Sequence, residues 1–183
     1  MEIKKVIFIH GNGSMRWSFG WASWLKEEID KLGIESIFET FPDSILARKK
    51  YWIPFLKEHL NADENTLLIG WSSGAVASMK YAEENKILGS ILVAPCYTDL
   101  GLENEKISGW YDDLWKWHQI KNNQKFISLI YSKNDEFIPV EEFNHIKENL
   151  NPNQITEFDE KGHFIKEKKM PEIIDSIKKI LEL

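Results

Sequence analysis

The stretch TLLIGWSSG at residues 66–74 is the part of the sequence that decides the fold. It opens with a continuous apolar run, which indicates a strand buried on both faces of a parallel sheet. From Gly74 onward, apolar side chains recur every three or four residues, which is typical of a helix. The G-x-S-x-G pentapeptide at residues 70–74 lies between the two, and it predicts a strained turn that exposes the hydroxyl of Ser72. The alternative is an ordinary loop in which Ser72 or Ser73 only caps the helix.

On both sides of this stretch, apolar runs alternate with helical patterns along the whole chain. The predicted strands are residues 6–9, 34–38, 66–69, 87–94, 126–131 and 154–158. The predicted helices are residues 17–32, 45–60, 74–84, 140–150 and 171–183, with a break or bend at Pro54. Residues 96–123 show little periodicity and are interpreted as an irregular insertion near the site. This order predicts one α/β domain over residues 1–183, with a mostly parallel sheet of about six strands and helices on both faces.

Composition excludes several classes of protein. The chain of 183 residues has a net charge of −6, which argues against a nucleic-acid binder. No apolar run is long enough to span a bilayer, so no membrane partner is expected. The apolar run at residues 6–9 enters a Gly-rich turn, which indicates a first strand and not a signal peptide. Cys96 is the only cysteine, so no internal disulfide forms and a cytoplasmic location is expected.

Two further polar residues follow predicted strands. Asp135 comes after the fifth strand and His163 after the sixth, and reactive residues of parallel sheets lie beyond the carboxyl ends of the strands. The order Ser72, Asp135, His163 is the one expected of an α/β-hydrolase. In that reading His163 is the base that activates Ser72, and Asp135 holds the imidazole in the right tautomer. Taken singly, Asp135 is more simply a turn former and His163 a surface histidine.

A serine nucleophile also needs backbone N–H groups that stabilise the developing oxyanion. Ser73 follows the nucleophile at the helix N-terminus, and Asn12 lies in the loop after the first strand, so these two are the expected donors. His118, in the irregular insertion, is the rival to His163 as base. No cluster of His, Cys and carboxylates has ligand spacing, so no metal and no cofactor is expected.

The eight tryptophans are unusual for a chain of this length. Trp17 begins a group whose spacing is typical of a core-facing helix stripe, whereas the group that begins at Trp110 is less regular. The walls of the substrate pocket are predicted to include Met15, Trp17, Trp71 and Trp110.

Several segments carry a resemblance to a known family. They are GNG at residues 11–13, FPDSILAR at 41–48, IGWSSGAVASMKYAE at 69–83, ILVAPCYTDLGLENEKISG at 91–109, SKNDEFIP at 132–139 and GHF at 162–164. With these motifs the chain resembles the small serine hydrolases typified by retinoblastoma-binding protein 9, with bacterial relatives of the YdeN type. The resemblance covers nearly the whole length and implies a minimal α/β-hydrolase core. The family's Ser–Asp–His triad falls on Ser72, Asp135 and His163.

The chain departs from the family at two places. The residue before the nucleophile is usually His in this family, and here it is Trp71, which affects the expected substrate. The retinoblastoma-binding motif L-x-C-x-E corresponds to residues 60–64, where Ala62 replaces the cysteine. A retinoblastoma-type partner is therefore not expected.

These observations support a serine hydrolase that cleaves a small ester or amide through an acyl-enzyme. The alternative is a catalytically weak or inactive hydrolase-fold protein that acts as a binding or regulatory partner. Lyase or acyltransferase chemistry at the same three residues is a third hypothesis that the sequence does not separate.

Overall fold

The computed structural model describes residues 1–13 and 15–183. One six-stranded sheet, in the order β2-β1-β3-β4-β5-β6, runs through the molecule. Its strands are β1 (Lys5–Ile9), β2 (Glu35–Phe38), β3 (Thr66–Trp71), β4 (Gly89–Val93), β5 (Phe126–Ser132) and β6 (Gln154–Phe158). Every pair of neighbouring strands is parallel. The prediction of a parallel α/β sheet is confirmed.

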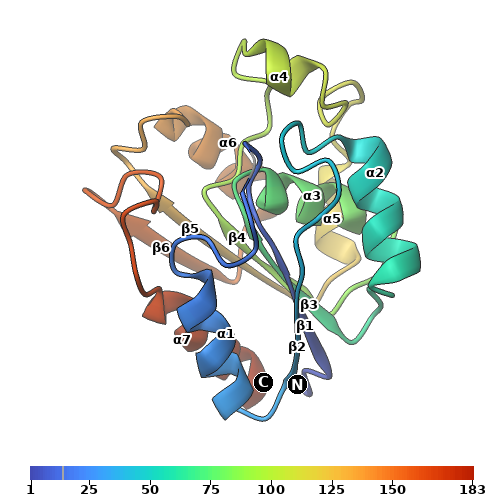
Figure 1. Cartoon of the computed structure of the whole chain (residues 1–183), viewed down its shortest axis with the longest axis vertical. Helices are drawn as coiled ribbons and strands as arrows, with labels where there is room; N and C mark the ends of the chain where they lie inside the picture. The colour runs from blue at the N-terminus through green and yellow to red at the C-terminus, as the bar shows by residue number, and fades with distance from the viewer. Residues whose placement is uncertain (14) are drawn as a thin grey trace.

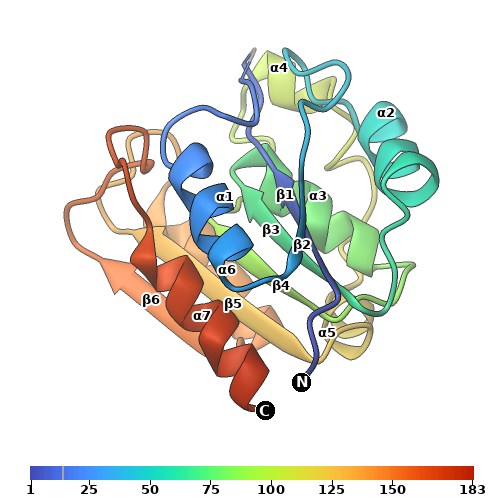
Figure 2. The same cartoon turned by 60° about the horizontal axis from the view of Figure 1, so that its bottom comes forward.

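Helices cover both faces of this sheet (Figures 1 and 2). They are α1 (Ala22–Lys31), α2 (Lys49–Pro54), η1 (Phe55–His59), α3 (Ser73–Ala82), α4 (Glu103–Lys106), α5 (Trp117–Asn122), α6 (Val140–Leu150) and α7 (Pro171–Glu182). Helices α1 and α7 pack together on one face, while α2, α3, α5 and α6 pack in a row on the other. Helix α4 stands beyond the carboxyl ends of the strands (Figure 1).

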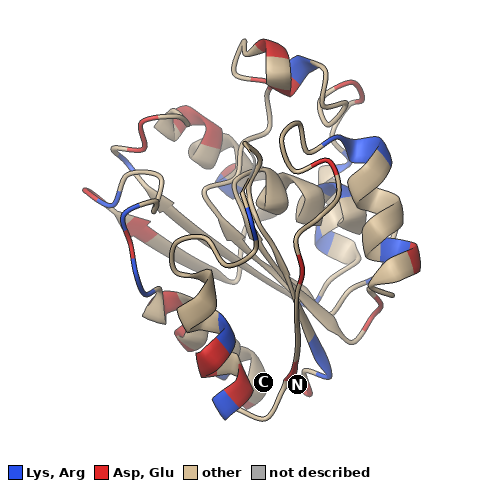
Figure 3. Cartoon of the chain, in the orientation of Figure 1, with Lys and Arg blue, Asp and Glu red and all other residues tan. Residues whose placement is uncertain are grey.

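The sheet forms because its central strands are apolar on both sides. All residues of β1 after its first, and all residues of β3, β4 and β5, are buried. Burying a Leu or Ile side chain contributes about 1.5–3 kcal/mol, so these strands supply much of the folding free energy. Figure 3 shows that acidic and basic residues are interspersed on the outer helices and loops, while most of the sheet is uncharged.

Two predicted helices begin later than their periodicity indicated. The first begins at Ala22, because Gly20 has a φ of +65° and the chain before it forms turns. Its buried stripe is made of Trp21, Leu25 and Ile29. The second begins at Lys49, since the preceding residues 43–48 are held in a turn.

The predicted break falls at Pro54, where α2 ends, whereas the insertion differs from its prediction. At Pro54 the helix passes from α to π geometry, because proline provides no N–H for a regular α-helical bond. Residues 96–123 were expected to be irregular throughout, and they contain the short helices α4 and α5.

The turn between β3 and α3 brings a helix end unusually close to the sheet. Ser72 has φ 56° and ψ −121°, a strained conformation for a residue with a side chain. A Cβ atom at Gly70 would lie 2.3 Å from the carbonyl oxygen of Gly74, and one at Gly74 would lie 2.0 Å from that of Ile9. Both glycines are therefore required by the close approach of α3 to β1 and β3.

A buried histidine ties the loop after β1 to the loop before α2. His10 Nδ1 lies 2.7 Å from Gly11 O, and His10 Nε2 accepts the N–H of Phe41 at 2.9 Å. One ring nitrogen accepts and the other donates, so the imidazole is neutral. Its ring also packs edge-on against Phe41 and Trp52. Burial lowers the pKa of His10 below 6.5.

We predict that Gly74→Ala destabilises the protein by about 1–3 kcal/mol or more, because the added methyl group meets backbone that is fixed by the sheet. Urea denaturation measures this change. Gly33→Ala is the matched control, since a Cβ there meets nothing within 4 Å and only its φ of +72° opposes the substitution. Equal losses for the two variants would contradict the steric account.

We also predict that His10 makes the folded state less stable in mild acid. The unfolded chain binds a proton at His10 near pH 6.5, whereas the folded protein binds it only at lower pH. Its contribution to stability is therefore complete above pH 6.5 and is lost as the pH falls through the lowered pKa of the folded state. Urea midpoints between pH 7.5 and 5.5 should fall less for His10→Gln than for the unsubstituted protein. The same fall in both proteins would show that other groups cause it.

Candidate active site

Three of the residues singled out by sequence lie in loops at the same edge of the sheet. Ser72 follows β3, Asp135 follows β5 and His163 follows β6. Since all strands are parallel, their carboxyl ends meet at one edge, where α4 also lies (Figure 1). Ser72 and His163 both line one cavity of about 310 Å³. In the part of the chain that the structure describes, no hydrogen bond joins these two side chains, which is common before substrate binds.

Asp135 lies behind His163 and fixes its ring. His163 Nδ1 is 2.7 Å from Asp135 Oδ2, and the aspartate side chain is fully buried. The other oxygen, Asp135 Oδ1, accepts the N–H groups of Phe137 and Ile138 at 2.9 and 3.0 Å. A carboxylate held in this way accepts the Nδ1 proton, so Nε2 is left as the basic nitrogen.

Three side chains close to Asp135 in the sequence accept hydrogen bonds from the backbone around His163. Ser132 Oγ accepts the N–H of residue 161 at 2.8 Å, and Asn134 Oδ1 accepts that of residue 162 at 2.8 Å. Glu136 Oε2 accepts the N–H of His163 itself at 3.0 Å. These contacts escaped the sequence reasoning. The sequence signal for them was the run of polar residues in SKNDEF at residues 132–137, of which every second one makes such a contact.

Trp71 also holds the backbone of His163. Its indole N–H donates to the His163 carbonyl oxygen at 3.1 Å. The indole is 1% exposed and packs against Phe19 and Trp21. It was predicted to line the substrate pocket, but the structure places it beneath the histidine loop, outside the lining of the cavity.

The cavity beside Ser72 is lined mainly by apolar side chains. Its lining residues are Asn12, Met15, Ser72, Ser73, Cys96, Leu100, Leu102, Asn104, Glu105, Phe137, Ile138, His163 and Ile165. Phe137 is 55% exposed, and its ring lies edge-on to the His163 imidazole with centroids 5.2 Å apart. A cavity of this volume is at the small end of ligand sites, which suits a small substrate.

Both residues predicted to donate backbone N–H groups lie at this cavity. Ser73 is the first residue of α3, where N–H groups have no partner inside the helix. Within residues 1–13 and 15–183, neither its N–H nor that of Asn12 donates to a protein acceptor. The Asn12 side chain donates to Glu105 Oε1 at 2.6 Å.

A series of polar side chains in contact with one another extends from Asn12 into the insertion. Glu105 Oε2 lies 3.4 Å from the Tyr111 hydroxyl, which lies 3.1 Å from Cys96 Sγ. Burial raises the pKa of the Glu105 carboxyl, and the hydrogen bonds from Asn12 and Tyr111 act in the opposite direction. Burial likewise raises the pKa of Cys96 and of Tyr111, so the thiol is not an activated nucleophile. Sequence reasoning missed Glu105, since an acid in a loop looks solvent-exposed.

Of the other pocket residues predicted from the sequence, Met15 lines the cavity and the two tryptophans do not. Trp17 packs edge-on against Phe38. Trp110 is fully buried and donates to the carbonyl of Ala47 at 2.7 Å. The Trp17 indole therefore packs the first loop against the core, and the Trp110 indole packs the insertion against it.

His118, the rival base, lies on α5 and contacts Asn122 at 3.1 Å. Its side chain is exposed and lies outside the cavity. Among the described residues, no group of three or more His, Cys, Asp or Glu side chains is suited to hold a metal. The same residues contain no helix long and apolar enough to cross a bilayer.

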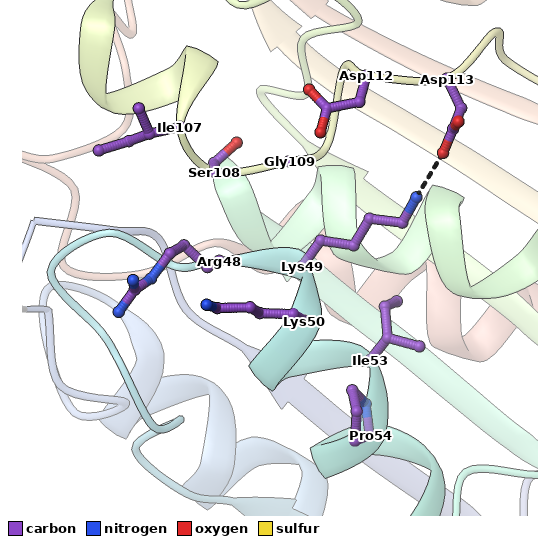
Figure 4. A pocket seen from close by; sticks show the side chains of 10 residues that line it. All are labelled: Arg48, Lys49, Lys50, Ile53, Pro54, Ile107, Ser108, Gly109, Asp112 and Asp113. Atoms are coloured by element: carbon purple, nitrogen blue, oxygen red, sulfur yellow. Dashed lines mark hydrogen bonds and ion pairs between the residues drawn. The ribbon is translucent and has the colours of Figure 1, made fainter.

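A larger groove of about 660 Å³ lies elsewhere, between α2 and residues 107–113. Figure 4 shows the Lys49 side chain extended across it to Asp113, at 3.1 Å. Arg48, at its edge, is paired with Asp43 at 2.8 Å. Neither Ser72 nor His163 lines this groove, so its volume does not make it the reactive site.

Comparisons with known proteins identify the family of the chain. The family model described as serine hydrolase matches residues 7–178. The rat protein "Serine hydrolase RBBP9" is 36% identical over 162 residues, which cover 87% of each chain.

Solved structures match the fold over nearly the full length. The ydeN gene product from B. subtilis has a TM-score of 0.88 at 21% identity, covering 98% of this chain and 100% of that one. Est1E from Butyrivibrio proteoclasticus has a TM-score of 0.78 at 12% identity, covering 99% and 88%. The Pyrococcus furiosus esterase Pf2001 has a TM-score of 0.69 at 18% identity, covering 99% and 83%. At these identities the structural matches establish the α/β-hydrolase fold alone, whereas the family model and the rat relative carry the classification. The chain therefore belongs to the serine hydrolase family.

Proposed function

We propose that this serine hydrolase cleaves small esters or amides through an acyl-enzyme on Ser72, with His163 as base and Asp135 as the residue that orients it. The observation that carries the proposal is the 2.7 Å contact between His163 and Asp135 at a cavity that Ser72 also lines. A serine hydroxyl needs such a base, because its proton must leave as the oxygen attacks.

The proposed reaction follows from these positions. His163 Nε2 takes the proton of Ser72 Oγ as the oxygen attacks the carbonyl carbon of the substrate, and the carbonyl oxygen becomes an oxyanion. The N–H groups of Asn12 and Ser73 bind that oxyanion, and one such donor lowers the barrier by about 3–4 kcal/mol. The intermediate then collapses, and His163 gives its proton to the departing alcohol or amine. Water, activated by the same histidine, releases the acid and restores the serine.

The proposed class of substrate follows from the lining of the cavity. Its small volume and mainly apolar wall favour a short acyl group. The proposed partner is therefore a small-molecule ester or amide, and the mechanism needs no metal or cofactor.

We predict that a fluorophosphonate adds once to the protein, at Ser72. Intact-mass spectrometry should show one adduct in the unsubstituted protein and in His118→Ala. It should show none in Ser72→Ala or His163→Ala, which lose the nucleophile and the base. Short p-nitrophenyl esters should be hydrolysed by the same two labelled proteins only. A folded, unlabelled parent protein would contradict the proposal and favour a binding or regulatory role.

We also predict that Trp71→Phe lowers kcat/KM about three- to tenfold, because the His163 carbonyl loses a buried hydrogen bond worth about 0.5–1.5 kcal/mol. Trp110→Phe is the matched control, since it removes another buried indole donor whose residue does not line the cavity. The far-downfield proton resonance of an imidazole N–H bonded to a carboxylate should shift only in Trp71→Phe. If both variants lose activity equally, Trp71 acts through general stability alone.

A further inference from the structure

One buried acid in the cavity wall has no part in the proposed chemistry. Glu105, on α4, is 8% exposed and lines the cavity together with Ser72 and His163. Its carboxylate forms no ion pair among the described residues. Removing a carboxylate from water costs several kcal/mol, so its retention here calls for a compensating interaction.

The strongest interaction of Glu105 is with Asn12. The Asn12 amide donates to Oε1 at 2.6 Å, which is short for a hydrogen bond to a carboxylate. The neighbouring Asn104 amide is 3.2 Å from the same oxygen, and the Tyr111 hydroxyl is 3.4 Å from Oε2. Glu105 therefore holds Asn12 more closely than it holds any group of its own segment.

This contact completes the anchoring of the loop that follows β1. On one side of Asn12, the buried His10 ring contacts the carbonyl of Gly11. On the other, the N–H of Gly13 donates to the carbonyl of Ile45 at 3.1 Å. The loop also lies against the nucleophile, since a Cβ at Gly11 would be 3.3 Å from Ser72 Cβ. The Glu105 bond fixes the side chain of the one residue between these anchors.

We propose that Glu105 is a positioning residue: its hydrogen bond to the Asn12 side chain fixes the direction of the Asn12 backbone N–H toward the oxyanion. The inference rests on the proposed function, which makes that N–H an oxyanion donor. Glu105 acts through Asn12 and not on the substrate. The insertion that carries α4 thereby has a role in the reaction beyond walling the cavity.

A double-mutant cycle on p-nitrophenyl acetate and butyrate tests this role. Glu105→Ala and Asn12→Ala should each lower kcat about 10- to 100-fold with little change in KM, because a displaced donor weakens binding of the transition state only. Asn12→Ala keeps the backbone N–H, so its loss of kcat reports the side-chain anchor alone. The double variant should be no slower than the slower single variant, since both substitutions remove one interaction.

Glu105→Gln provides the conservative comparison. Its amide oxygen can still accept the Asn12 N–H, so kcat should return to within a few-fold of the unsubstituted protein. Thermal unfolding of each variant shows whether it is folded at the assay temperature. If Glu105→Ala does not fold, Asn12→Ala and Glu105→Gln still decide the matter.

Four results would overturn the inference: unchanged kcat in Asn12→Ala, a fully additive double variant, equal losses in Gln and Ala at residue 105, or a rise in KM alone. The last would mean direct contact of Glu105 with substrate. If the unsubstituted protein hydrolyses these esters and Ser72→Ala does not, each of these results counts against the role of Glu105 only. Absence of hydrolysis by the unsubstituted protein would count against the proposed function itself.

Discussion

The close approach of Gly74 to the carbonyl of Ile9 sets the geometry of the sheet edge at which Ser72 lies. It lets the first turn of α3 rest on the ends of β1 and β3, where a methyl group at residue 74 would lie 2.0 Å from the oxygen of Ile9. The strained Ser72 and the N–H of Ser73 are thereby brought beside the loop that carries Asn12. The cost of the strain, about 1–3 kcal/mol, is small against the apolar burial of the surrounding strands.

The sequence predicted the sheet, and the position of three polar side chains at one of its edges, for reasons that can be traced to particular segments. The strands are short apolar runs separated by helical patterns, and β6 and α6 have the predicted bounds. Parallel strands place their carboxyl ends together, so Ser72, Asp135 and His163 could be grouped without any knowledge of contacts. The grouping follows from the parallel direction of the strands alone.

The positions of some side chains and helix ends depend on contacts between distant parts of the chain, which a local sequence pattern does not reveal. Trp71 precedes the proposed nucleophile, yet it does not line the cavity, because its indole packs against Phe19 and Trp21 and donates to the carbonyl of His163. Glu105 looks like a surface acid in an irregular segment, and only the folded chain brings it 2.6 Å from Asn12. Helix starts were misplaced at residues 17 and 45, because left-handed residues such as Gly20 and Ala47 interrupt patterns that otherwise fit a helix.

The strand order has a consequence for how activity is lost. Strand β6 is at the edge of the sheet, its residues alternate between exposed and half-buried, and the loop that carries His163 follows it directly. The central strands β3 and β4 are buried throughout. Opening of an exposed edge requires less free energy than global unfolding. The loop that carries His163 can therefore open while the central sheet stays intact. Under the proposed mechanism, heat or denaturant would then remove activity before the protein unfolds.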